Sequence, residues 1–214
     1  MFQKFTEVLN YIASHPDNFR EALGQHLLLV LVPLTISLVL GLPLGLLSAR
    51  SRTASTVLIN TVNGLRVIPS LAILFVAIPY LGLSFKSAAV ALTLLALPPI
   101  LISTDVAFRN IEPTIIEAAK GMGMSPRQIL QQIEIPLVLP VIIAGVKTAT
   151  VEVIASATLA AFIGAGGLGS FIVLGFALYD QSILLVGAIP VAILALVAEV
   201  GLSTLQRLTS SHSA

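Results

Sequence analysis

The sequence contains no cysteine and no tryptophan, and only 10% of its 214 residues are charged. Without cysteine the chain has no disulfide and no thiolate metal site, although this does not fix its cellular compartment. Soluble domains carry roughly 25% charged residues. The low charge, the 57% hydrophobic content and the mean hydropathy of +1.03 therefore predict an integral membrane protein. No stretch is long or polar enough for a second domain, so we expect one transmembrane domain over residues 1–214.

Groups for catalysis are also missing from the sequence. It has no Gly-Lys-Ser/Thr loop for a nucleotide phosphate, and its 3 histidines show no metal-ligand spacing. Asp105, Glu152 and Glu199 do not form the close carboxylate pair of a hydrolase. A net charge of +1, without a basic cluster interleaved with aromatics, gives no sign of nucleic-acid binding. The chain is therefore expected to be no enzyme and to hold no cofactor or metal.

Five apolar segments each approach the roughly 20 residues that cross a bilayer as a helix. They are residues 23–47, 57–80, 87–106, 137–162 and 183–205. Lys and Arg residues outside the spans are more numerous on one side: Arg50, Arg52, Arg109, Lys120, Arg127 and Arg207 against Lys4, Arg20 and Lys86. Because cytoplasmic connections carry the excess of Lys and Arg, we expect residues 112–136 and the C-terminus in the cytoplasm and the N-terminus outside.

The N-terminal residues 1–21 lack the uninterrupted apolar core of a signal peptide. Phe2, Phe5, Leu9 and Ile12 instead recur at helical spacing, which predicts a short amphipathic helix at the membrane interface. The His15-Pro16-Asp17 sequence is expected to end this helix. A flexible N-terminus is the alternative.

Small residues and prolines mark the interior of the predicted spans. Gly41 and Gly45 form a small-xxx-small pair, which lets another helix approach closely. The second span contains Pro69, and Pro98-Pro99 are expected to interrupt the third. The backbone groups freed by a break need neighbouring protein or a watery cavity. These prolines therefore suit a translocation path, although they also occur in purely structural membrane helices.

Four charged residues fall inside the predicted spans, namely Arg66, Lys147, Glu152 and Glu199. A lone charge at the bilayer centre costs at least about 2.5–3.5 kcal/mol, so we expect pairing or a wet cavity. Counted from the cytoplasmic ends, Arg66 and Glu152 lie at overlapping depths, as do Lys147 and Glu199. Two interpretations stay open: ion pairs that fix helix packing, and a pair that lines a pathway.

Residues 164–169 contain the string G-x-G-x-x-G, formed by Gly164, Gly166 and Gly169, with Gly167 inside it. A dinucleotide site needs a preceding strand and an acidic residue about 20 positions later. Here a membrane helix precedes the string and Asp180 comes too early, so we reject that interpretation. The glycines are instead predicted to turn the chain into a short external helix within residues 164–180, with a role in a gate as a hypothesis.

The connection at residues 112–136 reads as two short helices joined by a glycine hinge. Pro113 suits the first turn of a helix, and Gly121 and Gly123 tolerate the left-handed backbone of a helix end. Ser125-Pro126 followed by Gln128 predicts a capping box. Pro136 is expected to end the second helix.

This connection resembles the EAA loop of type I ABC-importer permeases. The resemblance rests on spaced residues: Glu117-Ala118-Ala119, Gly123 with Met124 after it, Ile133, and Ile135-Pro136, where Ile135 stands in place of the family's Leu. It implies an all-α permease fold whose loop docks into a groove of a cytoplasmic ATPase, in the helix-in-groove mode. It also implies a dimer of ATPase subunits that binds the ATP, a second permease subunit that is a copy or a paralogue, and an extracytoplasmic substrate-binding protein.

The run 97–100, the stretch 117–124 and the run 157–169 resemble the osmoprotectant branch, whose permeases import glycine betaine, carnitine, choline or proline betaine. Methionine and phosphonate permeases are the near alternatives. The chain has only 6% aromatic residues, whereas a quaternary ammonium is held by aromatic faces, so selection is expected to be delegated to the binding protein. An ion-coupled secondary transporter, or an assembly subunit without a pathway, is the alternative from another class.

Overall fold

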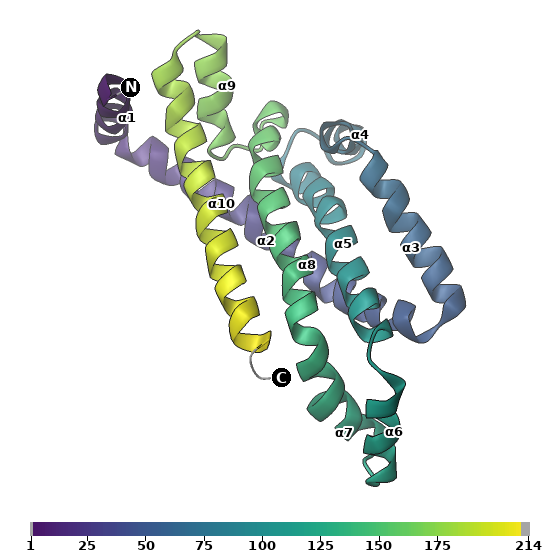
Figure 1. Cartoon of the computed structure of the whole chain (residues 1–214). Helices are drawn as coiled ribbons and strands as arrows, with labels where there is room; N and C mark the ends of the chain where they lie inside the picture. The colour runs from purple at the N-terminus through teal and green to yellow at the C-terminus, as the bar shows by residue number, and fades with distance from the viewer. Residues whose placement is uncertain (1, 211–214) are drawn as a thin grey trace.

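The computed structural model describes residues 2–210, apart from the side chains of Phe2, Gln3 and Phe5, so the predictions that rest on Phe2 and Phe5 lie outside the described side chains. Within that range four helical stretches are long and apolar enough to cross a membrane. They are α2 (Pro16–Arg50), α5 (Phe85–Arg109), the stretch Pro126–Ile163 that contains α8 (Ile135–Ser156), and α10 (Gln181–Ser210). They lie side by side, with α2 crossing obliquely behind the others (Figure 1).

The second predicted span is bent rather than straight. It consists of α3 (Arg52–Val67) and α4 (Ser70–Leu81), which meet at an angle of 98°. Between them Ile68 is extended, with φ −78° and ψ 123°, because the ring of Pro69 disfavours the helical conformation of the residue before it. The five predicted spans therefore correspond to four long helices and, where the bent pair counts as one span, a fifth.

Short helices gather at the two ends of the molecule (Figure 1). At one end lie α1 (Phe2–Ser14), α4 and α9 (Gly169–Ala177), which follows the 3₁₀ segment η2 (Ala157–Ile163). At the other end lie α6 (Pro113–Gly121), α7 (Pro126–Gln128) and the π-helical segment η1 (Ile129–Glu134).

The N-terminal helix packs on the rest of the chain. It ends at Ser14, and Pro16 opens α2, as the break at residues 15–17 predicts. Val8 is buried, and the ring of Tyr11 meets Phe171 of α9 edge-on, with ring centroids 6.1 Å apart. Residues 2–14 are therefore a packed helix rather than a flexible arm.

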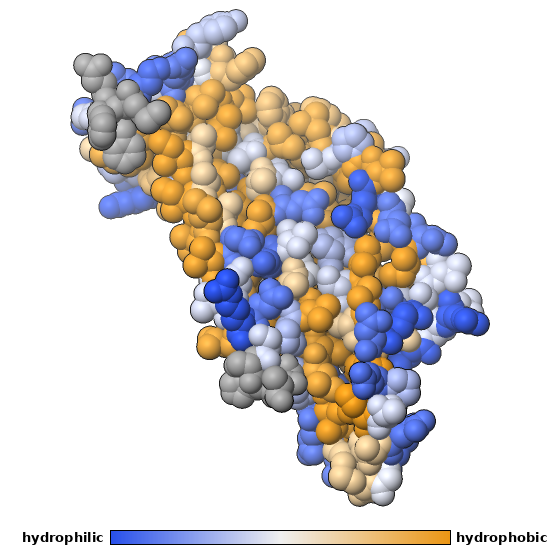
Figure 2. Space-filling view, in the orientation of Figure 1, coloured by the Kyte–Doolittle hydropathy of each residue, from blue (hydrophilic) through white to orange (hydrophobic). Residues whose placement is uncertain are grey.

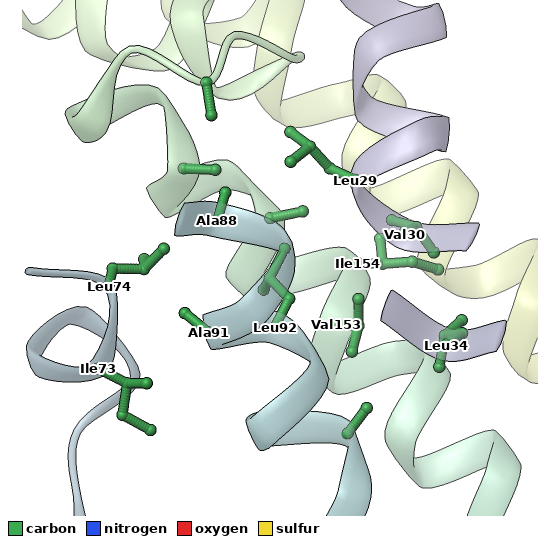
Figure 3. Close-up of a cluster of buried hydrophobic side chains, with 14 of the residues drawn as sticks. Leu29, Val30, Leu34, Ile73, Leu74, Ala88, Ala91, Leu92, Val153 and Ile154 are labelled. Carbon is green, nitrogen blue, oxygen red and sulfur yellow. The ribbon is translucent and has the colours of Figure 1, made fainter. Parts of the chain in front are cut away.

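The main core lies between α2, α4, α5, α8 and η2. Leu29 and Leu34 of α2, Leu74 of α4, Leu92 of α5 and Val153 of α8 meet in one buried cluster (Figure 3). Small residues bring the helices together, as predicted for Gly41 and Gly45. A Cβ at Gly45 would lie 2.5 Å from the Thr104 Cβ and 2.8 Å from the Leu101 carbonyl oxygen, so α2 and α5 are in backbone contact there.

The predicted interruption at Pro98-Pro99 is wrong, because α5 continues through both prolines from Phe85 to Arg109. Both prolines are buried. A proline removes one helical hydrogen bond, and packing against the neighbouring helices α2 and α8 holds the helix together around the gap.

Candidate functional site

The segments α6, α7 and η1 form a helical hairpin, residues 113–134, which protrudes from one end of the molecule (Figure 1). Pro113 stands in the first turn of α6, as predicted. At the tip Gly123 is left-handed, with φ 78°, and its N–H donates to the Lys120 carbonyl at 2.9 Å. Ser125 and Gln128 then form the predicted capping box: the Gln128 N–H donates to the Ser125 hydroxyl at 3.4 Å, and the Ser125 N–H donates to Gln128 Oε1 at 2.8 Å.

Two details of the hairpin differ from the prediction. Gly121 is the last residue of α6 and does not have a positive φ, so only Gly123 uses the left-handed backbone. Pro136 does not end the second helix, since it lies in the first turn of α8, which continues η1. In η1 the Ile135 N–H donates to the Leu130 carbonyl, five residues back. After this wider π-helical turn, α-helical hydrogen bonding begins again at α8. Pro136 lies in the first turn of α8, where the N–H that proline lacks is not needed for a helical hydrogen bond.

The hairpin turns most of its predicted site residues outward. Glu117, Ala118, Gly121, Gly123, Ser125, Pro126 and Pro136 are exposed, Met124 and Ile133 are half-buried, and Ala119 is buried. Met122 at the tip is 72% exposed. Ala119 and the buried Ile129 hold the hairpin together from inside. The outer face is therefore an exposed surface with an acidic side chain and small residues.

An ion pair ties the base of the hairpin to the end of α2. Arg50, the last residue of α2, pairs with Glu134, the last residue of η1. The Glu134 side chain is only 4% exposed, whereas that of Arg50 is 56% exposed. The pair borders an open groove of about 490 Å³, whose lining includes Leu46, Ile116, Lys120 and Leu130.

A second polar network joins α2 to α5 where α5 ends. The buried carboxylate of Asp105 accepts from the Ser48 hydroxyl at 2.6 Å and from the Arg109 guanidinium at 2.7 Å. Arg109 also donates to the Ser48 carbonyl at 2.9 Å. The i, i+4 spacing of Asp105 and Arg109 is a sequence signal that could have indicated this pair. No such local signal exists for Arg50 and Glu134, which are 84 residues apart.

Of the four intramembrane charges, two form an ion pair and two do not. Lys147 of α8 pairs with Glu199 of α10 at 3.0 Å, and the Ser203 hydroxyl bridges them, at 3.2 Å from each. Arg66 and Glu152 are both exposed. No direct ion pair joins these two among the described side chains.

Arg66 and Glu152 belong to an exposed polar surface that we call the polar face. Its residues are Thr53, Thr56, Asn60, Asn63 and Arg66 of α3 and Thr148 and Glu152 of α8. Hydrophilic side chains gather at mid-height over α8 and toward α3 in Figure 2, beside an apolar band along α10. Over residues 191–201 of α10 the exposed residues are apolar or glycine, among them Ile193, Leu196, Val197 and Val200. Lipid suits the α10 surface, whereas the polar face requires water or another polar partner.

The glycine string forms a tight turn between η2 and α9. Gly164, Gly166 and Gly167 all have positive φ, between 69° and 84°. The Gly167 N–H donates to the Gln25 Oε1 of α2 at 3.0 Å, and a Cβ at Gly169 would lie 2.1 Å from the Thr158 carbonyl oxygen. These glycines therefore serve backbone conformation and close packing, and the short helix predicted after them is α9. No group of His, Cys, Asp or Glu side chains within residues 2–210 is placed to hold a metal ion.

Comparison with known proteins gives the chain a family. Residues 41–210 match the family described as the binding-protein-dependent transport system inner membrane component. The chain is 41% identical over 203 residues to the carnitine transport permease protein OpuCB of Listeria monocytogenes, covering 94% of this chain and 93% of that protein. It is 38% identical over 183 residues to the choline transport system permease protein OpuBB of Bacillus subtilis, covering 86% and 84%.

A solved structure shares the fold. Inward-facing MetNI methionine ABC transporter matches with a TM-score of 0.77 over 90% of this chain and 96% of that chain, at 24% identity. At this level of identity the likeness shows the fold alone. The protruding hairpin, the long helices and the sequence matches agree, and the chain belongs to the family of multi-pass inner membrane permeases of binding-protein-dependent ABC transport systems, which are not themselves enzymes.

Proposed function

We propose that this permease is the transmembrane subunit of an ATP-driven importer that brings a small quaternary-ammonium osmoprotectant, such as glycine betaine, carnitine or choline, into the cell. The observation that carries the proposal is the 41% identity to a carnitine transport permease over 94% of this chain. The Bacillus subtilis relative named for glycine betaine, carnitine and choline transport is 34% identical over the same share. The likeness to the methionine transporter concerns the fold and favours no solute.

The hairpin is proposed to dock on a cytoplasmic ATPase that binds and hydrolyses the ATP. Its exposed Glu117, Ala118 and Met122 and the left-handed Gly123 form a surface with no partner inside residues 2–210. Through the ion pair of Arg50 with Glu134, a displacement of the hairpin would be transmitted to α2. This role places the hairpin in the cytoplasm and α1, α4 and α9 at the external end, in agreement with the Lys and Arg distribution.

The polar face is proposed to line the solute path together with a second permease subunit, a copy or a paralogue. Relatives of both kinds exist in one organism, since OpuCB and OpuCD of Bacillus subtilis are 34% and 37% identical to this chain. A binding protein would deliver the solute at the external end. There the turn at Gly164, Gly166 and Gly167, held by Gln25, is proposed to support a gate.

The test is uptake into proteoliposomes that hold the permease with its ATPase and binding protein. We expect ATP-dependent accumulation of glycine betaine or choline, and competition by the other quaternary-ammonium solutes. If methionine competed and betaine and choline did not, the solute would be wrong and the transporter type right. Uptake that ran on an ion gradient without ATP would refute the coupling role of the hairpin.

A double-mutant cycle tests whether the polar face belongs to the path. We expect Glu152→Gln to reduce transport more than it reduces the amount of folded protein in the membrane. Arg66→Ala and Glu152→Ala combined should reduce uptake by less than the product of the two single reductions, because residues that act together on one path do not contribute independently. Strictly independent effects would show that the two side chains share no partner.

A further inference from the structure

A small polar pocket lies between α8 and the last turns of α10. Its volume is about 280 Å³, and hydrogen-bonding side chains line it: Lys147, Ser203, Gln206, Arg207 and Ser210. Lys147 comes from α8 and the other four residues come from α10. The pocket therefore exists only where these two helices pack, and neither the hairpin surface nor the polar face includes its residues.

The pocket carries an excess of positive charge. Lys147 is neutralised by the carboxylate of Glu199 at 3.0 Å, and the Ser203 hydroxyl donates to the same carboxylate at 3.2 Å. An ammonium has three N–H donors. Glu199 and Ser203 take two of those of Lys147, so one remains. Arg207 is exposed and forms no ion pair with any side chain that the structure describes.

The chemistry of the lining favours a phosphate group as the ligand. Each of the five lining side chains can donate a hydrogen bond, and none of these five is acidic. The guanidinium of Arg207 presents a planar set of donors that matches two phosphate oxygens. The remaining N–H of Lys147 and the amide of Gln206 can donate to the other oxygens. A cation would find no carboxylate here that is not already paired.

The position of the pocket along α10 favours a lipid as the source of the phosphate. α10 has 30 residues, which extend over about 45 Å at about 1.5 Å per residue. The hydrocarbon core of a bilayer is only about 30 Å thick. The last turns of α10 therefore reach the depth of the lipid headgroups, where basic pockets between helices bind anionic lipids.

An apolar surface for an acyl chain leads directly to the pocket. Leu196, Val200, Ser203 and Arg207 follow one another at intervals of four, three and four residues, so they share one face of the helix. Leu196 and Val200 are 64% and 63% exposed. In Figure 2 the apolar band along α10 meets hydrophilic side chains at the lower end of the helix.

We propose that the pocket binds the phosphate of an anionic phospholipid, in the leaflet at the hairpin end of the molecule. Arg207, Lys147 and Gln206 donate to the phosphate oxygens, and an acyl chain lies along Leu196 and Val200. The bound lipid joins a side chain of α8 to side chains of α10 and so stabilises the packing of these two helices. The inference does not depend on which solute the transporter carries.

The test is a lipid titration of the full chain in dodecyl maltoside, with the midpoint of thermal unfolding as the readout. Dioleoyl phosphatidylglycerol should raise the midpoint and reach saturation. Inorganic phosphate lacks the acyl chains and dioleoylglycerol lacks the phosphate, so neither should raise it at the same concentration. Arg207→Ala should weaken the apparent affinity for phosphatidylglycerol about tenfold, because the phosphate loses its charged donor.

A second variant and a control locate the effect in the pocket. Gln206→Glu keeps the size of the side chain but places a negative charge against the phosphate, so it should weaken the affinity at least as much, even if Arg207→Ala does not fold. Arg52→Ala is the matched control, because Arg52 is an exposed arginine at the start of α3 and does not line the pocket. Its affinity should equal that of the unaltered chain.

Four results would overturn the proposal. The first is an unaltered chain whose midpoint does not rise with phosphatidylglycerol. The second is an equal loss of affinity in Arg207→Ala and Arg52→Ala, which would show a general attraction of the basic surface to anionic lipid. The third is unchanged affinity in Gln206→Glu. The fourth is an equal rise with inorganic phosphate, which would make the lipid the wrong source of the phosphate.

Discussion

Gly123 lies at the tip of the hairpin, and the free-energy cost of replacing it can be estimated from its backbone conformation. Its φ of 78° lies in the left-handed region, and a Cβ added there would meet no other atom within 4 Å. Gly123→Ala therefore introduces no clash, and its only cost is the conformation, about 1–2 kcal/mol for an L-residue. That shifts the balance between the native tip and other tip conformations about 5–30-fold.

We expect Gly123→Ala to insert and fold in the membrane at a normal level while its ATP-driven uptake falls several-fold. A bulky residue such as tryptophan at Gly123 should abolish uptake, because it would also obstruct docking of the tip. Gly123→Asn should retain more activity than Gly123→Ala, since asparagine tolerates the left-handed region.

Gly121 supplies the matched control. It also has no atom within 4 Å of an added Cβ, but it is helical, so Gly121→Ala should leave uptake intact and even stabilise α6 by about 0.5–1 kcal/mol. The assay is solute uptake and ATPase activity in proteoliposomes, normalised to permease content. Equal activity of Gly123→Ala and Gly121→Ala would refute the argument that the left-handed tip is needed.

Three further predictions concern other contacts. Glu117→Lys should leave the protein in the membrane but abolish ATP-driven uptake, because it reverses the charge of the exposed hairpin face; normal uptake would contradict the docking role. Arg50→Ala should lower the midpoint of thermal unfolding in detergent more than Glu134→Gln does, with costs in stability of about 3 kcal/mol and about 1 kcal/mol. Arg50→Ala leaves the buried Glu134 carboxylate without its partner, whereas Glu134→Gln leaves an arginine that water can solvate. The reverse order would refute the assigned burial. Gly145→Leu should lower folded yield, because its Cβ would lie 2.4 Å from a side chain of α5 and overpacking costs about 1–3 kcal/mol or more; Gly201→Leu, with open space around it, is the control and should express normally.

Much of the hairpin could be predicted from the sequence because its rules are local. Pro113 in a first turn, Ser125 with Gln128 three residues later, and Gly123 after a helix each act within a few residues of chain. The same holds for the break before Pro16. The errors arose where packing overrides a local rule, as when α5 continues through Pro98-Pro99 and the wider turn of η1 carries the helix past Pro136.

The candidate site was predictable only in part. The sequence identified four intramembrane charges and showed that each needs a partner or water. It could not decide that Lys147 and Glu199 pair across two helices while Arg66 and Glu152 stay open to the surface. That outcome depends on how each helix is rotated about its axis, which packing against neighbours determines.

Composition and short-range pattern alone determined that this is a helical membrane protein with a polar hairpin, because the cost of burying charge and the capping of helix ends are properties of short segments. The tertiary structure alone decided the size of the bend between α3 and α4, 98°, the pairing of Arg50 with Glu134 and the contact of Gln25 with Gly167. These features join residues far apart in the chain or depend on how a segment packs. They exist because small residues such as Gly45 and Gly145 let the helices pack closely in one arrangement.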